Sequence, residues 1–221
     1  MLAWHFVDET LKDGRPVPAD GERLTHDGPV SLCEGGLHAS ERVLDALKFA
    51  PGNTICRVEC DDVGERQSDK FVCGARTIVW RLDGDEVLRA FARKVALDVA
   101  GFWDMPDEVR RFLETGNDNL RVAARGAARQ ASREAVLSDE PQAAAAGEAA
   151  RAAAARTHAA RSTGLAAAWA ASKATRRAEA WDEFDRLLEA MIEEARATAP
   201  TQVADEDEWG DFADEIEAEF T

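Results

Sequence analysis

The sequence predicts an α+β fold: a small mixed or antiparallel sheet, followed by Ala-rich α-helices and an acidic tail. Turn signals separate short β-type runs in the first 82 residues. A helical period begins at Asp85 and becomes alanine-dominated beyond Leu120, and residues 205–221 hold nine acids and no base. We therefore expect an α+β head at 1–100, an Ala-rich helical region at 101–200 and a tail at 201–221.

Two strands are predicted most clearly in the head. Residues 54–60 follow the turn at Pro51-Gly52 and alternate in polarity. Their apolar face consists of Cys56, Val58 and Cys60. We expect this face to point into the core. Residues 76–82 form a β-branched run that ends at Asp83-Gly84, which predicts a second strand and a turn.

Helical spacing appears first between the strands. Val43, Leu44, Leu47 and Phe49 follow Ser40, which we expect to act as the helix N-cap. A long helix is predicted from Asp85, and Pro106 permits a new helix at 107–114. Breaks at 116–118 and 138–141 then divide the alanine-rich part into two or three helices. Because alanine buries little area, close packing between these helices must stabilise them.

One strongly apolar stretch runs from Trp169 to Ile192. Its large side chains are Trp169, Trp181, Phe184, Leu187, Leu188, Met191 and Ile192. We expect this stretch to pack against the head, the alternative being self-association with another subunit.

The four cysteines (Cys33, Cys56, Cys60 and Cys73) are expected to be reduced core residues rather than zinc ligands, because no CxxC pair is present. Walker, Rossmann, HExxH and GxSxG patterns are also missing from the sequence. We therefore expect no metal and no cofactor.

The formal net charge of −16 argues against a nucleic acid as the main partner, because phosphate neutralisation requires clustered Lys and Arg. An acidic protein suits a partner with a basic surface, or the charge serves solubility alone. No run approaches the ~18 apolar residues of a membrane span, and Met1–His5 does not resemble a secretory signal. We therefore expect no membrane association and a cytoplasmic location.

Residues 33–40, 45–52 and 56–59 carry the most distinctive pattern, including Gly36-Leu37-His38-Ala39-Ser40. The chain resembles a group of bacteriophage and prophage proteins that join such a head to an Ala/Arg/Trp-rich helical extension, over residues 4 to about 180. This resemblance implies a phage setting in a host cell.

The head more loosely resembles the ADP-ribosyltransferase fold. Residues 36–40, 46–50 and 55–59 match its order of glycine, hydroxyl-bearing strand, helix and strand. The resemblance implies that His5 lies on the first strand and that His38 and Ser40 lie in a nucleotide cleft. The family's catalytic glutamate has no convincing counterpart, and the tyrosine of one subgroup is missing because the chain contains none. Without the resemblance, His5 is a strand-packing residue and His38 a turn or core histidine.

Two further segments are candidate partner-binding sites. Arg121, Arg125, Arg129 and Arg133 are four residues apart and form a stripe that could meet a phosphate or acidic surface, or be a solvated helix face. The tail interleaves its acids with the apolar residues Trp209, Phe212, Ile216 and Phe220. Their helical spacing is typical of a segment that folds on docking to a basic surface, either a partner's or the arginine stripe itself.

Three functions follow from these patterns. The first is a phage-encoded, non-enzymatic interaction protein, acidic overall, that binds and inhibits a host or phage protein. The second is an ADP-ribosyltransferase-like or nucleotide-binding enzyme. The third is a virion or assembly component held together by the Ala-rich helices.

Overall fold

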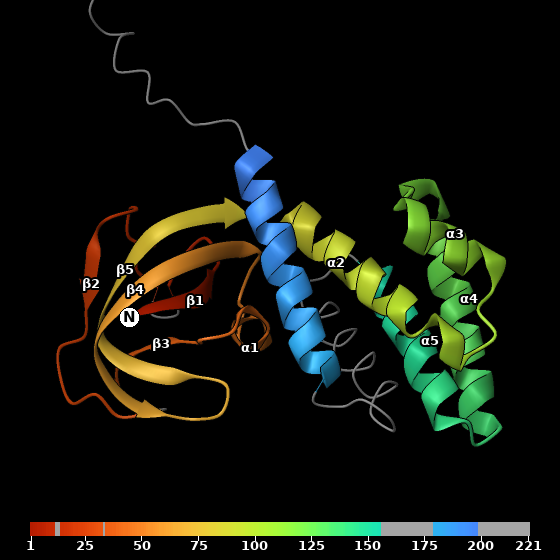
Figure 1. Cartoon of the computed structure of the whole chain (residues 1–221), viewed down its shortest axis with the longest axis horizontal. Coiled ribbons are helices and arrows are strands. Elements are labelled where there is room, and N and C mark those ends of the chain that lie inside the picture. Colours follow the sequence, from red (N-terminus) through yellow and green to blue (C-terminus); the bar gives the residue numbers. More distant parts are fainter. Residues whose placement is uncertain (12–13, 33, 156–178, 199–221) are drawn as a thin grey trace, which may run out of the picture.

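The computed structural model describes residues 1–11, 14–32, 34–155 and 179–198, and these residues form an α+β fold (Figure 1). A curved sheet forms one side of the molecule and helices form the other, which confirms the predicted fold class.

The sheet has five strands, and every strand pair is antiparallel. The strands are β1 (Leu2–Val7), β2 (Arg23–Thr25), β3 (Leu37–Ala39), β4 (Thr54–Arg66) and β5 (Phe71–Asp83). The long β4–β5 hairpin is the centre, with β1 on the outer edge of β4, and β2 and β3 both paired with β5. The two predicted strands are confirmed, and each is longer than its apolar run because the hairpin continues through polar residues.

The sheet closes on itself through one backbone bridge. Trp4 donates its N–H to the carbonyl of Ser40 at 2.8 Å, and the Ser40 N–H donates to the Trp4 carbonyl at 3.0 Å. Because Ser40 directly follows β3, the bridge joins β1 to the chain beyond β3. The strands therefore surround an interior, as in a small barrel.

Both faces of this sheet are buried. The interior holds the three cysteines Cys56, Cys60 and Cys73, together with Val58 and Phe71. The expectation that the cysteine face points into a core is confirmed. The opposite face is also buried, however, because helices cover Ile55 and its neighbours.

The helices begin close to the predicted positions. They are α1 (Val43–Lys48), α2 (Asp85–Asp98), the 3-10 turn η1 (Ala100–Phe102), α3 (Asp107–Thr115), α4 (Asp118–Leu137), α5 (Pro141–Ala153) and a further helix over residues 179–198. Gly116 ends α3 with φ 65°, in the left-handed region that favours glycine, and Asn117 caps α4 through its side chain.

Ser40 is not the N-cap of α1, so that prediction is wrong. Its hydroxyl donates to the Asp69 carbonyl at 2.7 Å, and its backbone is used in the bridge to Trp4. The position before α1 is Arg42, which forms no side-chain cap. Instead the carboxylate of Asp185, on helix 179–198, accepts a 3.0 Å hydrogen bond from the Leu44 N–H. A residue 141 positions away therefore supplies the cap.

Helices α4 and α5 pack closely through small residues, as the alanine content predicts. A Cβ at Gly147 would lie 2.9 Å from the Cβ of Ser132 and 3.1 Å from its Cα. The Ser132 hydroxyl donates across the same contact to the Ala144 carbonyl at 2.9 Å. Replacing either small residue by a larger one would push the helices apart.

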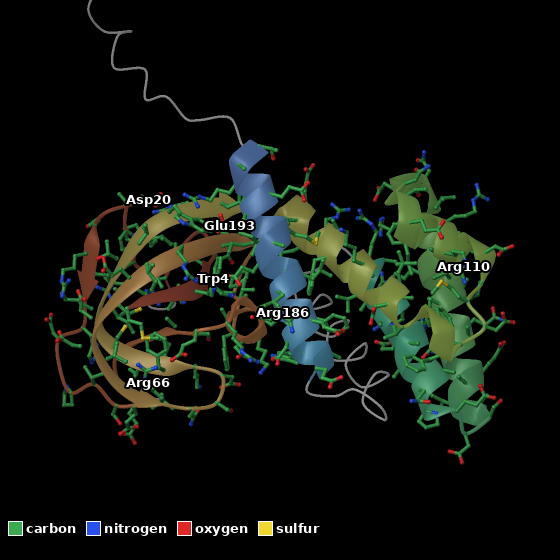
Figure 2. All side chains as sticks on the ribbon, in the orientation of Figure 1. Trp4, Asp20, Arg66, Arg110, Arg186 and Glu193 are labelled. Carbon is green, nitrogen blue, oxygen red and sulfur yellow. The ribbon has the colours of Figure 1, made fainter. Side chains whose placement is uncertain are left out.

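The described part of the apolar stretch, helix 179–198, packs in the chain's own core. Phe184, Leu188 and Ile192 are buried, and the Arg196 guanidinium lies 4.6 Å from the ring centre of Trp80. Trp4 lies on the side of the sheet that faces this helix (Figure 2). These three side chains are therefore not available to a second subunit, while Trp169 lies outside the described residues.

A single cluster of buried side chains connects the head to the helices. It includes Phe6 and Leu44 of the head, Phe91 of α2, Ala146 of α5 and Leu188. None of the helices in the described part of the chain combines the length and apolar character that a bilayer span requires.

Candidate functional site

A cavity of about 790 Å³ opens among β1, β2, β3, α1 and the loop that follows β1. This volume is within the range of sites for drug-sized ligands. His5, His38 and Ser40, the three residues that the sequence suggested for a ligand cleft, all line it.

Arg76 contributes a buried positive charge to the cavity wall. It lies near the middle of β5, opposite Leu24 of β2 and Cys60 of β4, and only 7% of it is exposed. One guanidinium nitrogen donates to the His38 carbonyl at 2.5 Å. Within the described ranges, no carboxylate forms an ion pair with Arg76. Burial lowers the pKa of its guanidinium, which nevertheless remains the charged form in proteins.

His5 lies on the same interior face, opposite Cys56 in the β1–β4 register. Burial lowers its pKa well below the ordinary value, and the nearby charges of Arg76 and His38 act in the same direction. His5 is therefore neutral near pH 7, and one of its ring nitrogens is a hydrogen-bond acceptor.

His38 contributes its backbone carbonyl to the site, and the Ser40 hydroxyl already donates a hydrogen bond elsewhere. The His38 carbonyl holds Arg76, and the Ser40 hydroxyl proton is given to Asp69. Gly36, one residue before β3, also lines the wall, and its φ is 121°. A Cβ there would lie 2.4 Å from the Val72 side chain, so glycine is required for β3 to start at this position.

An aromatic ring and a cation lie together on another part of the cavity lining. Phe49 is 51% exposed, although it is a large apolar residue, and the Lys70 ammonium lies 4.9 Å from its ring centre. The ammonium lies over the ring, so the pair adds an aromatic group and a positive charge to the cavity lining. Asp8 is the single carboxylate among the described residues that line the cavity.

The cysteines form part of the interior beneath this site. Burial raises the pKa of Cys56 to about 11. The side-chain hydrogen bond between Cys60 and Cys73 raises the pKa of Cys60 and lowers that of Cys73. In the described part of the chain, no three His, Cys, Asp or Glu side chains gather as metal ligands. Cys33 lies outside that part.

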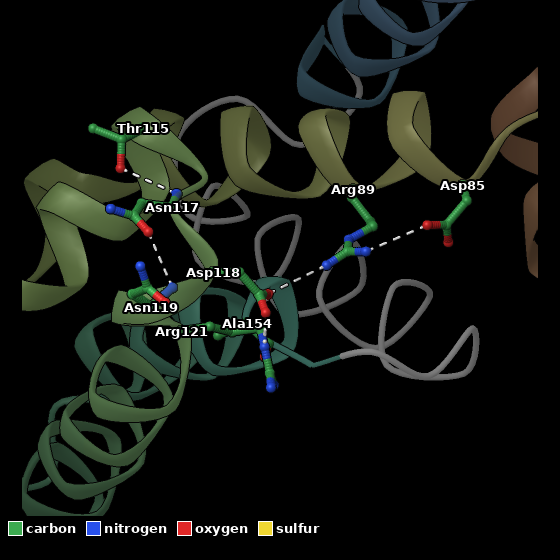
Figure 3. Close-up of polar contacts among 8 residues, drawn as sticks. All are labelled: Asp85, Arg89, Thr115, Asn117, Asp118, Asn119, Arg121 and Ala154. Atoms are coloured by element: carbon green, nitrogen blue, oxygen red, sulfur yellow. Dashed lines mark hydrogen bonds and ion pairs between the residues drawn. The ribbon is translucent and has the colours of Figure 1, made fainter.

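The arginine stripe does not form one uniform surface. Arg121 is held by two contacts within the chain: its guanidinium lies 3.0 Å from the Asp118 carboxylate and donates to the Ala154 carbonyl at 3.4 Å (Figure 3). Asp118 also pairs with Arg89 of α2, which links α4 to its neighbours. Arg125, Arg129 and Arg133 are exposed. The four tail candidates, Trp209, Phe212, Ile216 and Phe220, lie outside the described residues.

Sequence reasoning missed Phe49, Lys70 and Arg76 as site residues, and Arg76 is the most important of the three. The signal was available, because Arg76 and Ile78 alternate on one face of a β-branched run, and a charged residue at an inward position is rare unless it is paired. What the sequence could not show was the missing carboxylate, since pairing partners of a strand residue come from distant segments.

The family model of a domain of unknown function, DUF7666, matches residues 1–90. This is less than half of the chain, but it includes every residue that lines the cavity. No curated protein and no solved structure matches the chain.

Proposed function

We propose that the head binds an anionic small molecule of the nucleotide class in the cavity of β1, β3 and α1. The observation that carries this proposal is Arg76, a buried guanidinium that lines the cavity and has no carboxylate partner in the described part of the chain.

A buried charge without a counter-charge is costly, by several kcal/mol per ion. The His38 carbonyl and the interior thiols offset only part of this cost, because they are dipoles or neutral groups. An anionic group that enters the cavity would complete the pairing. A phosphate or diphosphate fits the planar, multi-donor guanidinium best.

The lining also favours a ligand with a flat ring. Phe49 is 51% exposed and has Lys70 over its ring, and neutral His5 offers an acceptor deeper in the cavity. A ring at Phe49 and phosphates at Arg76 would together match the chemistry of a nucleotide. The loose resemblance of the head to the ADP-ribosyltransferase fold supports the same class of ligand.

The proposal stops at binding and includes no reaction. Asp8 is the one carboxylate on the described lining, and it is exposed, so no buried acid is available there for acid–base catalysis. The phage setting, the inhibition of a host protein and the virion role stay predictions from the sequence, because no described contact identifies a partner.

The test is a ligand panel against the full chain. We would measure thermal stability and heats of binding with NAD, ADP, adenosine and pyrophosphate, each at up to ~1 mM. ADP or NAD should stabilise the fold in a saturable manner, by about 2.7 kcal/mol at 100 times Kd. Adenosine lacks the phosphates and pyrophosphate lacks the ring, so each should bind more weakly. If no compound of the panel bound, the proposed function would be wrong.

A further inference from the structure

The outer face of α4 is both cationic and apolar. Arg125, Arg129 and Arg133 are exposed on it, and three apolar side chains flank them: Val122 is 70% exposed, Val136 66% and Leu137 87%. At 100° per residue all six lie within about 60° of Val122, on the side opposite the buried Ala124 and Ala128. The face is therefore a continuous ridge along the helix.

The arginines of the helices fall into two groups, and these three belong with Arg93, Arg110 and Arg111, which form no ion pair among the described residues. Arg89, Arg121 and Arg151 each pair with a carboxylate. In the ranges that the structure describes, Arg125, Arg129 and Arg133 form no ion pair. The face gathers three positive charges in a chain whose net charge is −16. The arginines attract acidic groups, and burying the exposed apolar side chains at the ends of the ridge would further favour a bound partner.

We infer that this face is the docking site of the chain's own acidic segment, residues 205–221. The segment carries nine acids and no base, so its charge is complementary to the three arginines. It also supplies apolar side chains for Val122, Val136 and Leu137 to contact. These are Trp209, Phe212, Ile216 and Phe220, whose spacing places them on one side of a helical repeat.

The lengths of the α4 face and of the acidic segment are comparable. Val122 to Leu137 spans 15 residues of helix, or about 22 Å, and Trp209 to Phe220 would span about 16 Å at the same rise. Eleven peptide units separate residue 198, the end of the last described helix, from Trp209, and extended chain reaches about 36 Å over this length. A tether that spans the distance to its site gives an effective concentration on the order of 1 mM, at which even a weak contact would be well occupied.

The experiment measures amide hydrogen exchange of residues 205–221 in the full chain by mass spectrometry. With an intrinsic Kd of about 0.1 mM, a 1 mM effective concentration slows exchange about tenfold at low salt. Protection should disappear at 1 M salt, where the Debye length is about 3 Å. It should also disappear in the triple variant Arg125→Gln, Arg129→Gln, Arg133→Gln, and persist in the corresponding triple Lys variant, which keeps the charges.

The matched control removes three exposed cations from neighbouring helices, with Lys94→Gln, Arg110→Gln and Arg111→Gln. Lys94 lies on α2, and Arg110 and Arg111 lie on α3, where Figure 2 labels Arg110. This variant should keep the protection.

Three results would overturn the inference: an unprotected segment in the unmodified chain, protection that survives the triple Gln substitution, or an equal loss in the control. Protection that rises with protein concentration, together with a dimer in sedimentation, would assign the face to the acidic segment of a second copy and would also reject the intrachain contact.

Discussion

Arg76 and His5 create the electrostatic character of the cavity. Arg76 keeps its charge despite burial, and this charge helps to keep His5 neutral. An anion bound between them would reverse that effect, because it favours the charged form of a nearby histidine. The two residues are therefore a coupled pair, in which the proposed anion would bind to the arginine and raise the pKa of the histidine.

The lowered pKa of His5 makes stability depend on pH. Below about pH 6.5 the unfolded chain binds a proton at His5 that the folded chain does not bind, so stability falls as the pH falls, by at most about 1.4 kcal/mol per pH unit. Urea unfolding between pH 5 and 7.5 should show this decline, and His5→Gln should reduce it. An unchanged slope in the variant would mean that other groups cause the decline.

Among the elements, those with a local cause could be predicted from the sequence. The strand at residues 54–60, the start of α3 after Pro106 and the break before α5 depend on alternation, proline and turn residues, all of which act within a few positions. The helical spacing after Ser40 predicted α1, but not its cap. The sequence next to Ser40 contains no sign of Asp185, which reaches α1 only through tertiary packing.

Part of the candidate site could likewise be predicted from the sequence. The resemblance of the head selected His5, His38 and Ser40, which line one cavity. Arg76 was missed because its significance depends on what does not surround it in three dimensions. The difference between Arg121 and the other three stripe arginines was partly local, since Asp118 is three residues away, and partly hidden, since Arg121 also donates to Ala154 after α5.

The two glycines of the long helices test how closely α4 and α5 pack. Gly126 has no atom within 4 Å of an added Cβ, whereas a Cβ at Gly147 would lie 2.9 Å from the Ser132 Cβ. Gly126→Ala should stabilise the protein by about 0.5–1 kcal/mol through helix propensity. Gly147→Ala should destabilise it, by about 1–3 kcal/mol, because the contact is overpacked. Denaturant titration measures both, and a stabilising Gly147→Ala would contradict the described helix contact.

At the scale of the whole molecule, helix 179–198 connects the end of the described chain to the wall of the cavity. It contributes Phe184, Leu188 and Ile192 to the shared core and caps α1, whose Ala46 lies on the cavity lining next to Phe49. The predicted division into a head and a helical region therefore coexists with one continuous core. We expect that changes in helix 179–198 affect the head directly.

Asp185 provides the test of this connection. Burial raises the pKa of Asp185, although the Leu44 N–H and Arg42 oppose that effect. Because the folded state holds this proton more tightly than the unfolded state, the stability of the protein falls as the pH rises through the folded pKa. Asp185→Asn keeps an acceptor for Leu44 without the charge and should lie within about 0.5 kcal/mol of the unmodified protein at pH 7. Asp185→Ala should lose about 1 kcal/mol, as for other helix caps. Equal losses in the two variants would show that the charge matters rather than the acceptor.

Arg76→Met tests whether the buried guanidinium serves to bind an anion, with ADP affinity and unfolding free energy measured together. Replacing a buried, unpaired charge by an apolar side chain should leave stability unchanged or raise it, while ADP affinity falls at least ~30-fold. Arg57→Met is the matched control, because Arg57 lies on β4 with its guanidinium 4.4 Å from the Trp4 ring centre, on the helix-facing side of the sheet, and should not alter binding. If the Arg76→Met protein lost stability but bound ADP as before, Arg76 would serve the fold and not a ligand.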